Sequence, residues 1–490
     1  MTTTVDASMT EGGSNTVESA RFPALEEFKE AFATIQQLPY CSGHVALDED
    51  CSKIFYQGLN GQVNAIDFLN PAEKDLAALA EACHPASFGR GDQDVLDDTY
   101  RKAGKMDKKE FATQFDPFEN GIIDKIRGAL LPGEKGQKEI RAEMYKLNVY
   151  GPGSFFKAHV DTPRSDVMFG SLVVVLPTQH EGGSLMFRHK GNEVTFNTAQ
   201  AVSASTHPSP HAAYVAFFSD VEHEVTMVAS GYRVTLTYNL YFSDSPSALL
   251  SQDLLAVAPV TNNPVEKLKP ALAELLSNPE FLPKGGLFAF QLSHKYPFKV
   301  ASRSTSLTDL LGRLKGSDAL VKETCEAVNL PVQLKAMYAF KEDEYSDCML
   351  YALVDKFVNF NGRDIYAEEP IHFMLRKKKY GYRPFFAYPY PGKKPALDYY
   401  SGKGDLRLTP TVWVKLDEEQ EKREGDKKAE GKKACNSWDQ QYMTYGNEMQ
   451  LAHMYGEVCL VAKVKPATER LGQAHTSSTQ SDEVGQTQPI

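Results

Sequence analysis

Two histidines, one aspartate and one arginine stand at spacings that could build a metal centre. His159 and Asp161 are separated by one residue, His223 follows later, and Arg233 comes ten residues after His223. Side chains at i and i+2 of a β-strand share one face, so His159 and Asp161 can bind one ion together. Two neutral imidazoles and a carboxylate on one side of a metal suit Fe(II) and leave other coordination positions open. A planar guanidinium nearby can bind the carboxylate of a second ligand through two parallel hydrogen bonds.

The segments around these residues have the pattern of β-strands. Strands are predicted where short apolar or alternating runs end at glycines or turns, at residues 155–161, 171–176, 184–189 and 214–218. His223 is placed just after the turn at Ser219-Asp220. Residues 232–240 alternate, so Arg233, Thr235, Thr237 and Asn239 are expected to face a cavity while the apolar set packs on the opposite side.

Each of these residues has a simpler explanation when taken alone. A lone His-x-Asp is a weak signal, although only His159 of the twelve histidines stands two residues before an aspartate. A turn histidine such as His223 more often binds nothing, and an arginine most often forms a surface or structural ion pair. The combination favours the metal site, because the order, the strand placement and the interval from His223 to Arg233 agree.

Residues 145–242, about a fifth of the chain, resemble the double-stranded β-helix core of the 2-oxoglutarate/Fe(II)-dependent dioxygenases, in their prolyl 4-hydroxylase-like branch. The resemblance rests on short motifs at residues 150–153 (YGPG), 155–163 (FFKAHVDTP), 182–185 (GGSL), 220–225 (DVEHEV) and 231–235 (GYRVT). It implies an α+β fold with a double-stranded β-helix (jelly-roll) core covered by N-terminal helices and followed by a second mixed α/β region.

The resemblance also implies roles for individual residues. His159, Asp161 and His223 match the iron ligands of the family, and Arg233 matches the residue that pairs with the distal carboxylate of 2-oxoglutarate. Thr235 lies where related enzymes often place a hydroxyl on that carboxylate. Tyr150 lies where prolyl hydroxylases have a tyrosine that touches 2-oxoglutarate; a tyrosine lining the core is the alternative. The presence of Asp161 argues against halogenases of this fold, which lack the carboxylate ligand.

The activity implied by this family is hydroxylation of an unactivated carbon, coupled to oxidative decarboxylation of 2-oxoglutarate to succinate and CO₂. The cofactors would be Fe(II), 2-oxoglutarate as cosubstrate and O₂, with ascorbate as a candidate reductant. A protein side chain, proline among them, is the first substrate class, and a secondary metabolite or lipid is the second. A third option is a non-catalytic binding protein that keeps the fold. The intact ligand set and Arg233 argue against this option.

Composition limits the partners and the compartment. The net charge of −11 disfavours a nucleic-acid binder, which would carry a basic face. No apolar run approaches the roughly 20 residues that span a bilayer, and residues 1–17 lack the order of a signal peptide. The seven scattered cysteines indicate reduced thiols, hence an intracellular, cytoplasmic or nuclear protein. The oligomeric state is not indicated.

The chain is long enough for two domains with tails. The predicted oxygenase domain spans 21–245, with a helical cover (21–140) and a β-helix core (141–245). A second α+β region follows at 246–465 and contains a disordered insertion at about 417–433. Disordered tails are predicted at 1–20 and 466–490. Helices are expected around Phe28 and Phe32, from Asn70-Pro71, over 119–131, from Pro264 and over 307–330. A solvated helix is favoured over a lid loop at 94–107. The β core with its covering helices, about 21–245, contains every residue assigned to iron and cosubstrate.

Overall fold

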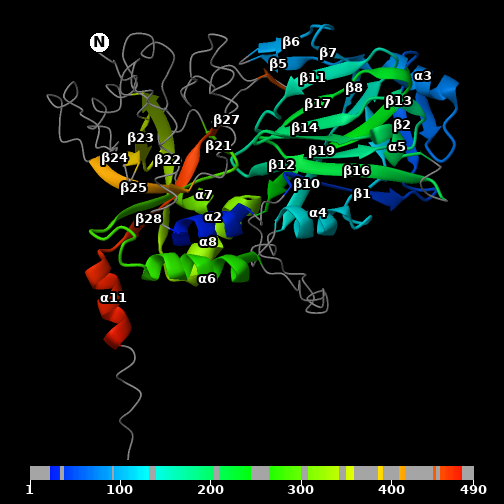
Figure 1. The fold of residues 1–490 in the computed structure, drawn as a ribbon. Coiled ribbons are helices and arrows are strands. Elements are labelled where there is room, and N and C mark those ends of the chain that lie inside the picture. Colours follow the sequence, from blue (N-terminus) through cyan, green and yellow to red (C-terminus); the bar gives the residue numbers. More distant parts are fainter. Residues whose placement is uncertain are drawn as a thin grey trace, which may run out of the picture.

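Two β-structures with separate hydrophobic cores lie side by side in this protein (Figure 1). The computed structural model describes residues 23–33, 38–90, 93–131, 139–203, 209–243, 264–299, 307–341, 349–357, 385–389, 408–414, 445–447 and 453–476. The first structure, here the jelly roll, lies within residues 38–243. The second, here the C-terminal region, lies within residues 264–476 and includes a closed barrel. The predictions for residues 1–20, 417–433 and the boundary near 246 fall outside the described residues.

The jelly roll consists of two antiparallel sheets that share one core. The larger sheet has the order β1-β16-β12-β19-β10-β8-β4, and the smaller one has the order β15-β14-β17-β11-β7. The strands of the larger sheet are β1 (Tyr40–Ala46), β4 (His84–Pro85), β8 (Gly104–Asp107), β10 (Ile140–Tyr150), β12 (Met168–Val175), β16 (His211–Phe218) and β19 (Arg233–Phe242). Those of the smaller sheet are β7 (Arg101–Lys102), β11 (Phe155–His159), β14 (Leu185–His189), β15 (Asn192–Phe196) and β17 (Glu222–Val225). This is a jelly-roll-type fold, as the sequence predicts.

The strands predicted around the motif are present, and their side chains alternate as expected. β12 and β16 are the apolar strands predicted at 171–176 and 214–218, and both are almost entirely buried. In β19 the apolar set enters the hydrophobic core, whereas Arg233, Thr235 and Thr237 line a pocket on the other face. β10 pairs with β19 so that Tyr150 lies opposite Arg233.

The prediction of a mainly helical cover at 21–140 is wrong. The described residues there include the helices α2 (Pro23–Ala33), α3 (Glu73–Ala82) and α4 (Ile122–Leu130), but also many short strands. Besides the strands already named, these are β2 (Lys53–Gln57), β3 (Val63–Asp67), β5 (Phe88–Arg90), β6 (Gln93–Val95) and β9 (Phe111–Thr113). Residues 94–107 accordingly form short strands on either side of a turn at 96–100, not the solvated helix that was favoured. Their pairing partners are remote in the chain, so the local pattern shows little of them.

The predicted helices also differ in their ends and in their packing. α3 begins at Glu73, two residues after Pro71, and its N-cap residue, Ala72, makes no side-chain cap. α2 was expected to cover the β core, but Phe28 packs edge-on against Phe288 and Phe290 of the C-terminal region. α3 packs on β10 of the jelly roll, and α4 packs on β1 and β10.

The C-terminal region is a closed barrel with helices on its surface (Figure 1). Its strand order is β20-β25-β24-β23-β22-β28. These strands are β20 (Gly286–Gln291), β22 (Val332–Lys341), β23 (Met349–Val354), β24 (Phe385–Pro389), β25 (Leu408–Val414) and β28 (Val458–Val464), and the helices are α6 (Pro264–Ser277), α7 (Leu307–Leu311), α8 (Gly316–Ala327) and α11 (Ala467–Thr476). α6 starts at the predicted Pro264, the helix predicted over 307–330 is two helices, and α11 contradicts disorder at 467–476.

Short strands connect the two parts. β26 (Tyr445–Gly446) of the C-terminal region pairs with β5, and Gly446 forms a parallel bridge with Val160. β21 (Tyr296–Lys299) and β27 (His453–Gly456) pair on the side of the barrel that faces the jelly roll (Figure 1). The remaining pair, β13 (His180–Gly182) with β18 (Val228–Gly231), and the short helix α5 (Thr198–Ala201) belong to the jelly roll. None of the described helices is long and apolar enough to cross a membrane. The five described cysteines are free thiols.

Candidate metal centre

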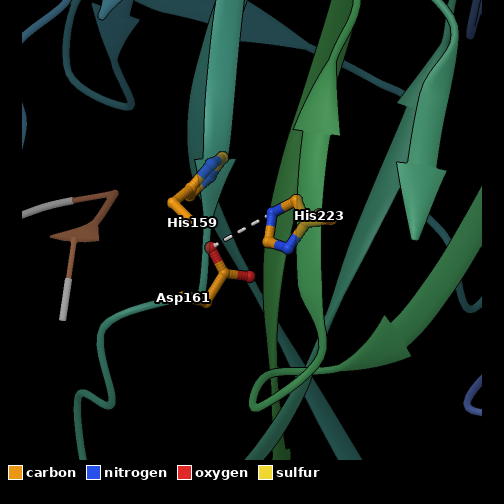
Figure 2. Close-up of side chains that lie close together, drawn as sticks. All are labelled: His159, Asp161 and His223. Carbon is orange, nitrogen blue, oxygen red and sulfur yellow. Dashed lines mark ion pairs between the residues drawn. The ribbon is translucent and has the colours of Figure 1, made fainter. Parts of the chain in front are cut away.

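The structure brings the three predicted ligands together (Figure 2). One ligand atom from each of His159, Asp161 and His223 lies within 4.8 Å of the other two, and among the described residues this is the group suited to a metal ion. His159 ends β11 and lies opposite His223 of β17 in the sheet register, and Asp161 follows two residues after His159. All three side chains are buried, at 4–5% exposure. Two adjacent strands and one loop therefore build the arrangement.

Both imidazoles are oriented by backbone carbonyls. Nδ1 of His159 lies 2.8 Å from the carbonyl oxygen of Lys157, and Nδ1 of His223 lies 3.0 Å from that of Val221. A carbonyl only accepts, so each Nδ1 carries the proton and each Nε2 keeps its lone pair for a metal. Burial, then the neighbouring His223 and Arg101, hold the pKa of His159 well below its ordinary value. His159 is therefore neutral, as a metal ligand must be.

The Asp161 carboxylate is oriented through both of its oxygens. Oδ2 accepts a hydrogen bond from the Ser171 hydroxyl, and Oδ1 accepts one from Nδ2 of Asn447 at 2.6 Å. Oδ1 is also the oxygen that lies 3.9 Å from Nε2 of His223 (Figure 2). The carboxylate is thus held in one rotamer, with Oδ1 turned toward the imidazoles.

Arg233 is a buried cation for which the part of the chain that the structure describes shows no ion pair. Arg233 is only 1% exposed, and its Nε and Nη2 atoms have no hydrogen-bond partner among the described residues. The guanidinium lies 5.1 Å from the centre of the Tyr150 ring, and burial lowers the pKa of Arg233 to about 10. Gly183 leaves room for it, since a Cβ there would lie 2.8 Å from Cδ of Arg233. Unpaired buried donors are costly, so this geometry fits an anionic ligand that brings acceptor oxygens.

The pocket joins the ligands to the predicted cosubstrate residues. The three ligands, Arg233, Thr235 and Tyr150 all line one cavity. The same cavity is lined by further polar residues that were not predicted: Arg101, Lys146, Asn148, Ser171 and Asn447. Asn148 and Lys146 could have been found, because they lie two and four residues before Tyr150 on one strand face. Arg101 and Asn447 carry no local signal.

Arg101 adds a second buried guanidinium near the ligands. It is 5% exposed and lies 4.3 Å from the centre of the Phe156 ring, which in turn stacks on the His159 ring at 3.5 Å. Arg101 donates to two neutral acceptors, the carbonyl oxygen of Ser87 at 2.7 Å and Oδ1 of Asn148 at 3.2 Å. The pocket is therefore positively charged on two sides, which suits acidic ligands.

Comparison with known proteins decides the family of this domain. Residues 145–241 match the family model of the 2OG-Fe(II) oxygenase superfamily. This segment belongs to that superfamily. The match covers about a fifth of the chain and contains the motifs between residues 150 and 235. No curated protein gives a significant match to the chain.

Several solved structures are similar to part of the chain. A prolyl-4-hydroxylase from Pseudomonas putida is 18% identical over 44% of this chain and 99% of its own, with a TM-score of 0.26. A prolyl hydroxylase from Trichoplax adhaerens, solved with a hypoxia inducible factor oxygen degradation domain peptide fragment, is 17% identical over 46% and 96% (TM-score 0.27). A viral collagen prolyl hydroxylase from Paramecium Bursaria Chlorella virus-1 is 15% identical over 29% and 80% (TM-score 0.19).

Proposed function

We propose that this protein is an Fe(II)- and 2-oxoglutarate-dependent dioxygenase that hydroxylates an unactivated carbon and releases succinate and CO₂. One observation carries the proposal: a buried His-Asp-His ligand set lines the same pocket as a buried arginine whose Nε and Nη2 have no hydrogen-bond partner among the described residues. The ligand set suits Fe(II) with open coordination positions. The arginine suits a dicarboxylate whose far end lies away from the metal.

In this proposal His159, Asp161 and His223 hold Fe(II), and Arg233 pairs with the distal carboxylate of 2-oxoglutarate. Thr235 and Tyr150 line the pocket beside Arg233 and are assigned to the same carboxylate. When bound, the metal supplies activation of O₂ at the cosubstrate. The chain supplies orientation and a dry site, because ligands and arginine are each at most 5% exposed.

We propose a protein side chain as the prime substrate, with proline the first residue to test. The size of the C-terminal region, which reaches the pocket through Asn447, supports a macromolecular substrate. A small molecule such as a secondary metabolite or a lipid is the alternative outcome.

The test is succinate formation by the Fe(II)-loaded full-length protein with 2-oxoglutarate, O₂ and ascorbate. Peptide pools and metabolite extracts are supplied separately, and products are searched by mass spectrometry for the gain of one oxygen atom. Stimulation by a peptide supports protein hydroxylation, whereas stimulation by an extract supports the small-molecule alternative. Succinate formation that is no greater than in the His159→Ala/Asp161→Ala double variant would overturn the proposed function.

A further inference from the structure

Asn447 of the C-terminal region enters the pocket and contacts three parts of the jelly roll. Its Nδ2 donates to Oδ1 of Asp161 at 2.6 Å, and its Oδ1 accepts from the backbone N–H of Thr162 at 3.0 Å. Its own carbonyl oxygen accepts from Nη1 of Arg101 at 3.5 Å. Because a backbone N–H can only donate, the contact with Thr162 fixes which end of the amide faces Asp161. Asn447 therefore presents a donor to the carboxylate.

The backbone around Asp161 is bound by the same region. Gly446, next to Asn447, forms a bridge with Val160, and the Tyr455 hydroxyl donates to the carbonyl oxygen of Asp161 at 3.0 Å. β26, which carries Gly446, is itself anchored on β5. The position of Asn447 is thus set by backbone pairing, as a role in orientation requires.

The segment before the other ligand is bound as well. Asp220 lies three residues before His223, and its carboxylate is 2% exposed. It accepts from Nζ of Lys315 at 2.8 Å and from the backbone N–H of Lys295 at 2.8 Å. The preceding residue, Ser219, accepts at its carbonyl oxygen from the N–H of Asp161 at 3.1 Å. Both ligand-bearing segments of the jelly roll are therefore bound to the C-terminal region.

We propose that Asn447 is a positioning residue of the metal centre, and that the C-terminal region is thereby part of that centre. The proposal rests on the proposed function in one respect, that a metal binds His159, Asp161 and His223. Ser171 holds one carboxylate oxygen and Asn447 holds the other, so rotation of the carboxylate away from the imidazoles requires a hydrogen bond to break. Residues 21–245 hold every side chain assigned to iron and cosubstrate, and Asn447 adds a contact to one of these ligands from outside that range.

The experiment measures Mn(II) binding to the full-length apoprotein, by loss of the free-ion EPR signal, without O₂ or 2-oxoglutarate. Mn(II) occupies the same oxygen and nitrogen ligands and needs no turnover. Asn447→Ala should weaken Mn(II) affinity about 10- to 100-fold, the usual cost of losing a hydrogen-bond partner of a metal ligand. Arg313→Gln is the matched control, because it removes another contact between the two parts, 3.5 Å to Asp166, without touching a ligand. Its Mn(II) affinity should stay at the wild-type value.

Circular dichroism and a cooperative melt check the fold of each variant. Equal affinity in folded Asn447→Ala and wild type overturns the positioning role but leaves the proposed function intact. An equal loss in Asn447→Ala and Arg313→Gln also overturns it, since docking of the two parts in general would then be the cause. Should Asn447→Ala not fold, Tyr455→Phe replaces it and should weaken Mn(II) binding severalfold; no change there overturns the proposal. Wild-type Mn(II) binding that His159→Ala does not affect would instead contradict the proposed function.

Discussion

Replacement of Arg233 by methionine should affect ligand-free stability and cosubstrate affinity in opposite directions. Met keeps much of the length of the side chain but removes the charge and the unpaired donors. A pKa of about 10 in place of 12.5 corresponds to about 3 kcal/mol by which burial disfavours the charged guanidinium. The ligand-free Arg233→Met protein should therefore be more stable than wild type, by up to about 3 kcal/mol less any loss of packing. Because methionine has no guanidinium to bind the distal carboxylate, the variant should bind 2-oxoglutarate at least a hundredfold more weakly than wild type.

Urea unfolding of the apoprotein measures the first effect, and anaerobic titration of the Mn(II)-loaded protein with 2-oxoglutarate measures the second. Arg188→Met is the control, because Arg188 is paired with Glu224 at 2.7 Å and Glu193 at 2.8 Å and lies outside the pocket. That variant should be slightly less stable than wild type and bind 2-oxoglutarate normally. A less stable Arg233→Met apoprotein with unchanged 2-oxoglutarate affinity would refute the reasoning, since Arg233 would then be a structural residue.

Three further predictions concern the ligands, the contact between the two parts, and pH. His159→Ala and Asp161→Ala should each abolish turnover, and anaerobic Fe(II) with 2-oxoglutarate should give a weak visible charge-transfer band in wild type only; a band in the double variant would contradict the ligand assignment. Lys315→Met leaves Asp220 buried without its cation, so urea unfolding should show a loss of about 3–5 kcal/mol, and a loss below about 1 kcal/mol would show that the pair is not needed. Burial, then the nearby His294, lowers the pKa of His189 to about 3, so the unfolded chain binds this proton more tightly and stability falls as pH decreases from about 6.5. Between pH 7 and pH 5 the free energy of unfolding, measured with urea, should fall for wild type by up to about 2 kcal/mol more than for His189→Gln. An equal decrease in the two proteins would contradict the lowered pKa.

The central strands and the ligand set could be predicted because their signals are local. β12 and β16 are continuous apolar runs, and β19 alternates with a period of two, so both their existence and the face of Arg233 follow from the sequence. His159 ends β11 and Asp161 follows in the loop, so their short spacing brings both to one site although only His159 lies in the strand. The short strands β1, β7 and β8 could not be predicted in this way, since each is stabilised by a partner strand far along the chain.

Asn447 was beyond sequence reasoning for the same physical reason. It lies 286 residues from Asp161, and a single asparagine in a polar stretch carries no periodicity and no motif. What defines its role is the tertiary pairing of β26 with β5, which no local pattern encodes. Arg101 is similar, because its approach to the Phe156 ring depends on the pairing of β7 with β11.

The contact between Asn447 and Asp161 also couples metal binding to the docking of the two parts. If the docked arrangement raises the affinity for the metal by some factor, then the metal must strengthen docking by that same factor, because both belong to one thermodynamic cycle. A 10- to 100-fold effect corresponds to about 1.4 to 2.7 kcal/mol. That amount adds to the buried pair of Asp220 with Lys315, which connects the two parts on the side of His223. On this proposal the C-terminal region does more than recruit a substrate, because one contact contributes both to the free energy of metal binding and to the free energy of docking of the two parts.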